Sequence, residues 1–128
     1  MTLTSLLLLI KEVFGMKFTK RQLLDWLLDV TGAEEVYPFT REKSKYTPVI
    51  RHRRNQKMLA LVTEKDGNLL LNLKLKPEQV ENMLETKGVI PAYHMNKKHW
   101  LTVLVNETEL TENELKNMVL ESSQLTQG

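Results

Sequence analysis

The side chains best suited to chemistry in this sequence are basic, and they gather in one stretch. Between positions 41 and 57 a single acid, Glu42, stands among seven basic residues: Arg41, Lys43, Lys45, Arg51, Arg53, Arg54 and Lys57. Lysine and arginine bind phosphates, and each such contact releases counterions condensed on a nucleic acid. The stretch therefore indicates a phosphate-binding hairpin, with Arg51 and Arg53 on one strand face and Arg54 at the tip. A charged strand edge that discourages sheet-to-sheet pairing is the structural alternative.

A second basic patch lies in the segment YHMNKKHW, where Lys97 and Lys98 stand between two aromatic rings. Tyr93 and Trp100 could stack on unpaired bases. The structural alternative, which we favour, is that Trp100 anchors the loop to the core while polar groups bond to the backbone. The two lysines are a separate matter: as a basic patch, Lys97 and Lys98 are expected to contact phosphates. The residues expected to position the loop are His94, Asn96, His99 and Trp100.

Charge is separated along the chain. Residues 107–128 contain one basic residue, Lys116, and five acids: Glu107, Glu109, Glu112, Glu114 and Glu121. The whole chain has 18 Lys and Arg against 16 Asp and Glu, a net charge of +2. So small a net charge identifies no polyanionic partner, and the local separation is the more informative feature.

Metal binding and catalysis find little support in the residue types. His94 and His99 offer two ligands where a metal site needs three or four. The absence of cysteine excludes disulfides, thiolate zinc sites and cysteine nucleophiles, and it fits a reducing compartment. The serines lie in no nucleophile-elbow pattern, and no glycine-rich phosphate loop occurs. We therefore expect a protein without enzymatic activity, metal or cofactor.

Helical periodicity and capping signals place three helices in the chain besides a short one after Pro77. Apolar residues at three- and four-residue steps predict an amphipathic helix over 3–14, ended by Gly15. Capping boxes at Thr19 and Thr111 predict helices that run to Gly32 and to about position 125. Pro77 fits a first helical position, and the helix that it begins should stop near Gly88.

Strand-like apolar content occupies segments 34–39, 48–53, 57–63, 69–75, 89–92 and 101–105. Asp66-Gly67 marks a tight hairpin turn, and the leucines of 69–75 alternate with Asn72 and Lys74. We therefore predict an antiparallel sheet in an α+β domain of two layers, with three or four strands before the helix that begins at Pro77.

The length of 128 residues fits one domain. We predict a boundary that separates an N-terminal amphipathic extension, residues 1–17, from a domain over 18–128. The longest early apolar run, 6–10, is far shorter than the roughly 20 residues that span a bilayer. We therefore expect a cytoplasmic protein with no membrane partner.

Several linked segments resemble the bacterial MmcQ/YjbR family. The segment TKRQLLDWLLDVTGAEEVYPF is similar to the family's opening helix and strand, and KMLALV to its second hairpin strand. LNLKLKPEQVENML resembles its strand and proline-initiated helix, and VIPAYHMNKKHWLTVLV its signature segment. The sequence departs from the family at HRRNQK, where a glycine-containing turn is usual, and at Ser122-Ser123, where Ser-Tyr is usual.

The resemblance implies an α-β3-α-β2-α fold and a double-wing arrangement that grips DNA. We therefore predict binding of nucleic acid, with duplex DNA the expected form. The predicted phosphate contacts are Arg51, Arg53, Arg54, Lys57, Lys97 and Lys98. The alternative is a protein-interaction module that uses the sheet or helix 3–14 to bind another polypeptide or a second copy of the chain.

Overall fold

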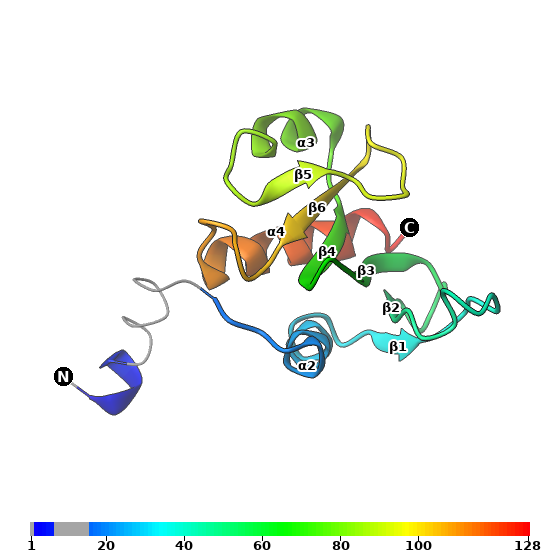
Figure 1. Ribbon diagram of the computed structural model, residues 1–128, viewed down its shortest axis with the longest axis horizontal. Helices are drawn as coiled ribbons and strands as arrows, with labels where there is room; N and C mark the ends of the chain where they lie inside the picture. Colours follow the sequence, from blue (N-terminus) through cyan, green and yellow to red (C-terminus); the bar gives the residue numbers. More distant parts are fainter. Residues whose placement is uncertain (1, 7–15) are drawn as a thin grey trace.

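The computed structural model describes residues 2–6 and 16–128 (Figure 1). In chain order its elements are α2 (Lys20–Thr31), β1 (Glu34–Val36), β2 (Val49–Arg51), β3 (Met58–Lys65), β4 (Asn68–Lys74), α3 (Pro77–Met83), β5 (Val89–Pro91), β6 (Trp100–Leu104) and α4 (Glu112–Leu125). Residues 3–6 are also helical, but most of the predicted helix 3–14 lies outside the described residues. Within the described residues, no helix is long and apolar enough to cross a membrane.

The strands form one six-stranded sheet in the order β1-β2-β3-β4-β6-β5. Every neighbouring pair is antiparallel. The Asp66-Gly67 turn joins β3 to β4 with a positive φ at both residues, 52° and 79°, as a tight hairpin of this kind requires. The predicted α+β fold with an antiparallel sheet is confirmed. Four strands precede α3, because the three-residue β1 joins the sheet in addition to β2, β3 and β4.

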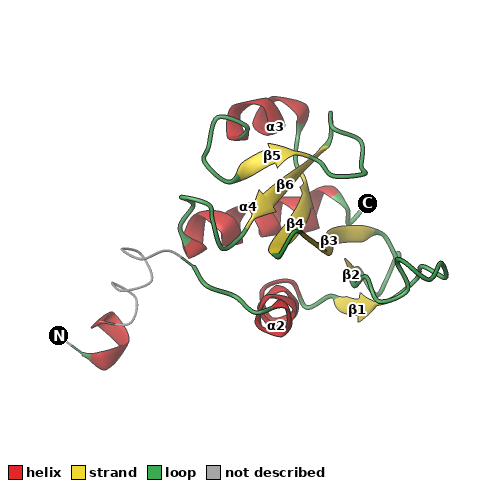
Figure 2. Ribbon diagram, viewed as in Figure 1, coloured by secondary structure: helices red, strands yellow, loops and turns green. Residues whose placement is uncertain are grey.

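The long helices α2 and α4 pack against each other, and α4 also packs on β3 and β4, as Figure 2 shows. Both helices begin at the predicted capping boxes, where Thr19 and Thr111 accept from a backbone N–H and the third helical residue bonds back. The left-handed Gly32 ends α2, with φ of 66°. These local signals therefore fix where the helices begin, and packing fixes where they lie.

The sheet face that the helices cover, here called the helix face, is apolar. Its central side chains come from alternate positions of the strands and are fully or almost fully buried: Ala60, Val62, Leu71, Leu73, Leu101 and Val103. The helices contribute Leu23, Leu24, Leu27, Leu115 and Val119 to the same core. The alternation of leucines in 69–75 therefore predicts correctly which side chains of β4 lie on the helix face.

Several elements are shorter than predicted. β1 ends at Val36, before Tyr37-Pro38, because proline cannot donate to a sheet ladder. β2 ends at Arg51, and Arg53 and Arg54 lie in a turn and not on a strand. α3 ends at Met83, and the chain turns through Gly88 (φ 81°), where an added Cβ would lie 2.4 Å from the Cα of Thr108.

Candidate nucleic-acid interface

The two basic loops predicted to bind phosphate project from the same end of the sheet. Loop 52–57 joins β2 to β3, and loop 92–99 joins β5 to β6. The register pairs Ala60 with Leu73 and Lys74 with Trp100, so β3 begins, β4 ends and β6 begins at this end. Because β3 and β6 are two strand spacings apart, their starts lie about 10 Å from each other. We call this the loop end of the sheet.

Loop 52–57 is fixed to the last turn of α4. The ring Nε2 of His52 lies 3.0 Å from the carbonyl oxygen of Ser123 and 2.9 Å from Oγ1 of Thr126. The side-chain amide of Asn55 donates to the carbonyl oxygen of Thr126 at 2.9 Å, and the Lys57 ammonium donates to the carbonyl oxygen of Gly128. Helix C-termini attract cations and hydrogen-bond donors, so the helix end and the basic loop stabilise each other.

The four basic residues of this loop and its strand differ in their freedom to bind a ligand. Arg51 is part-buried and its Nε lies 3.0 Å from Oε1 of Glu34, while Arg53 Nη1 lies 3.9 Å from Oε2 of the same carboxylate. The Arg53 side chain is nevertheless 71% exposed. Arg54 is exposed, and no carboxylate of the described residues lies within 4.0 Å of it. Arg53, Arg54 and Lys57 are therefore exposed, but the Lys57 ammonium is already bonded to Gly128, and Arg51 serves a structural ion pair.

The sequence interpretation that Arg51 and Arg53 share a strand face needs one correction. Arg53 lies beyond the end of β2, in the turn, because the backbone closes through His52 N–H to the Lys57 carbonyl at 3.0 Å. Both arginines still meet Glu34, so they remain on one side of the molecule. A hollow of about 300 Å³ beside them is lined by His52, Arg54, Asn55 and Gln127.

Asn96 orders the second half of loop 92–99. The carbonyl of Asn96 accepts from the N–H groups of His99 and Trp100 at 3.3 and 2.9 Å, and its side-chain oxygen accepts from the N–H of Lys98 at 2.9 Å. Lys97 and Lys98 are exposed on the turn that these bonds form.

The three other residues expected to position this loop are placed differently. His94 is exposed, with φ of 60°, and its ring centroid lies 4.0 Å from that of Tyr93. His99 contributes its carbonyl, which accepts from Leu75 N–H at 3.0 Å. Trp100 pairs with Lys74 in the ladder. Among residues 2–6 and 16–128, no three His, Asp or Glu side chains gather as metal ligands would.

Lys74 is a candidate binding residue that the sequence analysis did not single out. It stands opposite Trp100 in the ladder, between the two basic loops, and is half-buried. No carboxylate of the described part of the chain lies within 4.0 Å of its ammonium. The alternation of Asn72 and Lys74 with leucines placed it away from the helices, but only the strand order shows which loops flank it.

A serine from α4 holds the backbone of Lys74. A bulge in the β2–β3 pairing disturbs the ladder beside Leu59. The Ser122 hydroxyl bridges β3 and β4 there, since it accepts from Lys74 N–H at 2.9 Å and donates to the Leu59 carbonyl at 2.5 Å. Ser123 and the HRRNQK loop, the two places where the sequence departs from the resembled family, are in contact through the bond of His52 to the Ser123 carbonyl.

A separate charged cluster joins α2 to β1. Arg21 forms a paired hydrogen bond with the carboxylate of Glu35, which also accepts from the Tyr37 hydroxyl at 2.6 Å. These bonds, chiefly that from Arg21, hold the pKa of Glu35 below its usual range. The hydrogen bond to Glu35 raises the pKa of Tyr37. The cluster stabilises the edge of the sheet and leaves the cations of the loop end free of this carboxylate.

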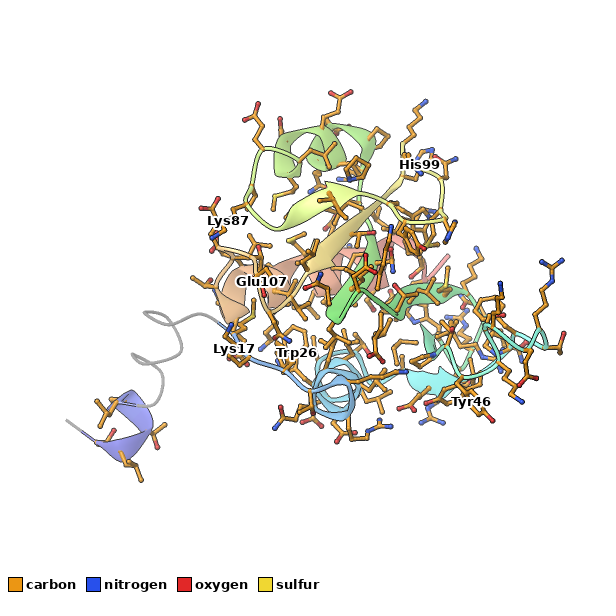
Figure 3. The ribbon with its side chains drawn as sticks, viewed as in Figure 1. Lys17, Trp26, Tyr46, Lys87, His99 and Glu107 are labelled. Atoms are coloured by element: carbon orange, nitrogen blue, oxygen red, sulfur yellow. The ribbon has the colours of Figure 1, made fainter. Side chains whose placement is uncertain are left out.

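Several acids of residues 107–128 lie away from the loop end. Figure 3 places Glu107, Lys17 and Lys87 on the opposite side of the domain from His99 and Tyr46. Glu112 and Glu114 occupy the first turn of α4, where acids are favourable at a helix N-terminus. The loop end carries the exposed cations Arg53, Arg54, Lys97 and Lys98, and its acids include Glu34 beside Arg53 and Glu121 beside Lys76.

Comparisons with known proteins give one consistent relationship. The chain is 30% identical over 118 residues to the uncharacterised protein YyaQ of Bacillus subtilis, a match that covers 84% of this chain and 98% of YyaQ. A crystal structure of a Pseudomonas syringae protein is 32% identical, with a TM-score of 0.75, covering 86% of this chain and all of that one.

A Deinococcus radiodurans structure described with the DUF419 domain is 28% identical, with a TM-score of 0.64, covering 80% of this chain and 76% of that one. The sequence model of the YjbR family matches residues 28–125. This match spans most of the chain, so the protein belongs to the YjbR family.

Proposed function

We propose that this protein binds DNA without catalysing a reaction, and that the loop end of the sheet is its binding surface. Loops 52–57 and 92–99 act as two wings that contact phosphates, and duplex DNA is the form we expect. The observation that supports the proposal is the strand register, which brings two basic patches 40 residues apart in sequence to one end of the sheet.

The distance between the wings suits a duplex. Their strands begin about 10 Å apart, and the major groove of B-DNA is about 12 Å wide. Arg53, Arg54, Lys97 and Lys98 carry the binding charge, because they are exposed and, unlike Lys57, are not bonded to the end of the chain. Arg51 and Lys57 position loop 52–57 through Glu34 and the end of α4. Such contacts to phosphate carry little base sequence information, so weak sequence selectivity is expected.

The test is a fluorescence-anisotropy titration of labelled duplex DNA at several salt concentrations. We compare the wild type with Arg53→Gln/Arg54→Gln and with Lys97→Gln/Lys98→Gln. Each pair should weaken binding and lower the slope of log affinity against log salt by about 2, since each phosphate contact contributes roughly 0.9.

The matched control is Lys87→Gln/Lys116→Gln, which also removes two positive charges. Lys87 lies on the opposite side of the domain from His99 (Figure 3), and Lys116 lies in the first half of α4, whose other end meets loop 52–57. This control should keep the wild-type slope. Equal losses in all three variants would show that only the net charge matters and would refute a defined surface. No binding by wild type at low salt would refute the proposed function and leave a protein-interaction role as the alternative.

A further inference from the structure

The chain has two tryptophans, and they are used differently. Trp26 lies on α2, where its ring packs against Phe18 with centroids 5.6 Å apart, and it borders the core. Trp100 is half-buried at the start of β6. Within residues 2–6 and 16–128, no aromatic ring packs on the Trp100 indole, and the ring Nε1–H donates no hydrogen bond. Among the described residues Trp26 therefore packs on Phe18 and the core, and Trp100 has neither contact.

Trp100 and Lys74 face the same side of the sheet, away from α2 and α4. Two residues further along the same strands, the Thr102 hydroxyl donates to the side-chain oxygen of Asn72 at 2.5 Å, so these two side chains share a face. Side chains alternate along strands, so Lys74 and Trp100 share that face too. Arg51 of β2 lies on that face as well. Val49 stands opposite Leu61 and Leu61 opposite Asn72, so Val49 shares the face of Asn72, and Arg51 is two residues further along the same strand.

The result is a strip across the second face of the sheet, defined by Arg51, Lys74 and Trp100, that connects the two basic loops. Its central cation, Lys74, meets no carboxylate among the described residues. An ammonium group beside a flat indole has the chemistry to bind one nucleotide, because the cation takes a phosphate and the ring stacks on a base.

Whether a nucleic acid can bind to Lys74 and Trp100 together depends on whether its bases are paired. Within a duplex each base is stacked on its neighbours, and only its edges are accessible in the grooves. An indole fixed in a sheet cannot enter that stack, but it can stack on a base that has no partner. The strip therefore favours an unpaired nucleotide.

We propose that Lys74 and Trp100 form a subsite for one unpaired nucleotide, so that the preferred ligand is DNA with a single-stranded segment next to a duplex. The inference rests on the proposed function, since the basic loops supply the binding to the duplex. The backbone of both residues is held in place: the Ser122 hydroxyl accepts from the backbone N–H of Lys74 at 2.9 Å, and the Asn96 carbonyl accepts from the backbone N–H of Trp100 at 2.9 Å. Binding therefore needs no rearrangement of the backbone, which lowers its conformational entropy cost.

Two tryptophans allow a direct test. In a Trp26→Phe variant, Trp100 is the single tryptophan, and its fluorescence reports the subsite alone. We titrate this protein with a blunt duplex and with the same duplex carrying a short thymidine overhang. The overhang should quench Trp100 and bind about 5 to 150 times more tightly than the blunt duplex, because stacking on one base contributes roughly 1–3 kcal/mol.

Lys74→Gln and the control Lys116→Gln each remove one charge. Lys74→Gln should abolish most of the preference for the overhang, and Lys116→Gln should keep it. Trp100→Phe keeps a smaller ring and should lose part of the preference, and circular dichroism would confirm that each variant folds. Blunt and overhang DNA binding equally, with no change in Trp100 fluorescence, would overturn the subsite while the proposed function stands. No binding of either DNA would overturn both.

Discussion

Both faces of the sheet are buried at their centres, but only one of them has buried polar side chains among its strand residues. The helix face contains leucine, valine and alanine packed against α2 and α4. The second face contains Asn72 and Thr102, both fully buried, in a chain of hydrogen bonds from Tyr93 N–H through Thr102 and Asn72 to the Leu61 carbonyl. The first face stabilises the fold, and the second orders loop 92–99 above it.

This difference indicates which face of the sheet can offer groups to a ligand. A dry apolar face gains stability from burial but offers no group to a ligand. The polar chain on the second face costs desolvation unless every member is paired, and it gives the start of loop 92–99 a defined position in return. Lys74 and Trp100 extend this polar face to the loop end.

The largest effect should come from the helix face. Leu71 is fully buried in the centre of β4, so Leu71→Ala leaves a cavity and should lower the free energy of unfolding by about 2–5 kcal/mol. Urea denaturation followed by circular dichroism measures it. Leu120→Ala, at a leucine that is 42% exposed on α4, is the control and should change stability by less than about 0.5 kcal/mol. Similar losses in both variants would contradict this assignment of the core.

The second largest effect on stability should come from Ser122, the residue of α4 whose hydroxyl joins β3 to β4. Ser122→Ala removes the hydroxyl that joins Lys74 N–H to the Leu59 carbonyl, and both groups are then left unpaired in the interior. We expect a loss of about 1–3 kcal/mol in the free energy of unfolding. Ser123→Ala is the matched control, because the bond from Ser123 to His52 uses its carbonyl. A neutral Ser122→Ala would show that the bulge closes without the serine.

The second face allows one substitution to be compared at two sites. Thr102→Val removes a hydroxyl that bonds to both Tyr93 and Asn72, and it should cost about 1–2 kcal/mol. Thr63→Val makes the same change where the buried hydroxyl has no hydrogen bond to a described residue. It should be neutral or stabilising, because an unpaired buried hydroxyl is unfavourable. Equal effects in thermal unfolding would remove the distinction between the two sites.

The smallest effect concerns pH. Arg21 and Tyr37 lower the pKa of Glu35, so this carboxylate stabilises the fold above its unfolded pKa, about 4.3. The contribution is lost as the pH falls through the lower pKa of the folded state. The melting temperature of Glu35→Gln should therefore lie below that of wild type at pH 7, and the gap should shrink below about pH 4. The exposed Glu81→Gln is the control; a gap independent of pH would refute the role of this carboxylate.

Much of the fold follows from short-range signals in the sequence. The capping boxes at Thr19 and Thr111, the Asp66-Gly67 turn and the leucine alternation in 69–75 each depend on residues within a few positions of one another. The physical reason is that caps, tight turns and the two-residue period of strands are properties of the local backbone. Strand ends were less predictable, and Arg53 was placed on a strand that ends before it.

The candidate site was only partly predictable. The sequence by itself determined which residues carry charge and that Asn72 and Lys74 lie opposite the leucines of β4. Only the tertiary structure decided that Arg51 is held by Glu34, that Lys74 stands between the two basic loops, and that Ser122 fixes its backbone. Those facts depend on strand order, on register and on a helix 48 residues away in sequence, which are set by packing of the whole chain and not by any local pattern.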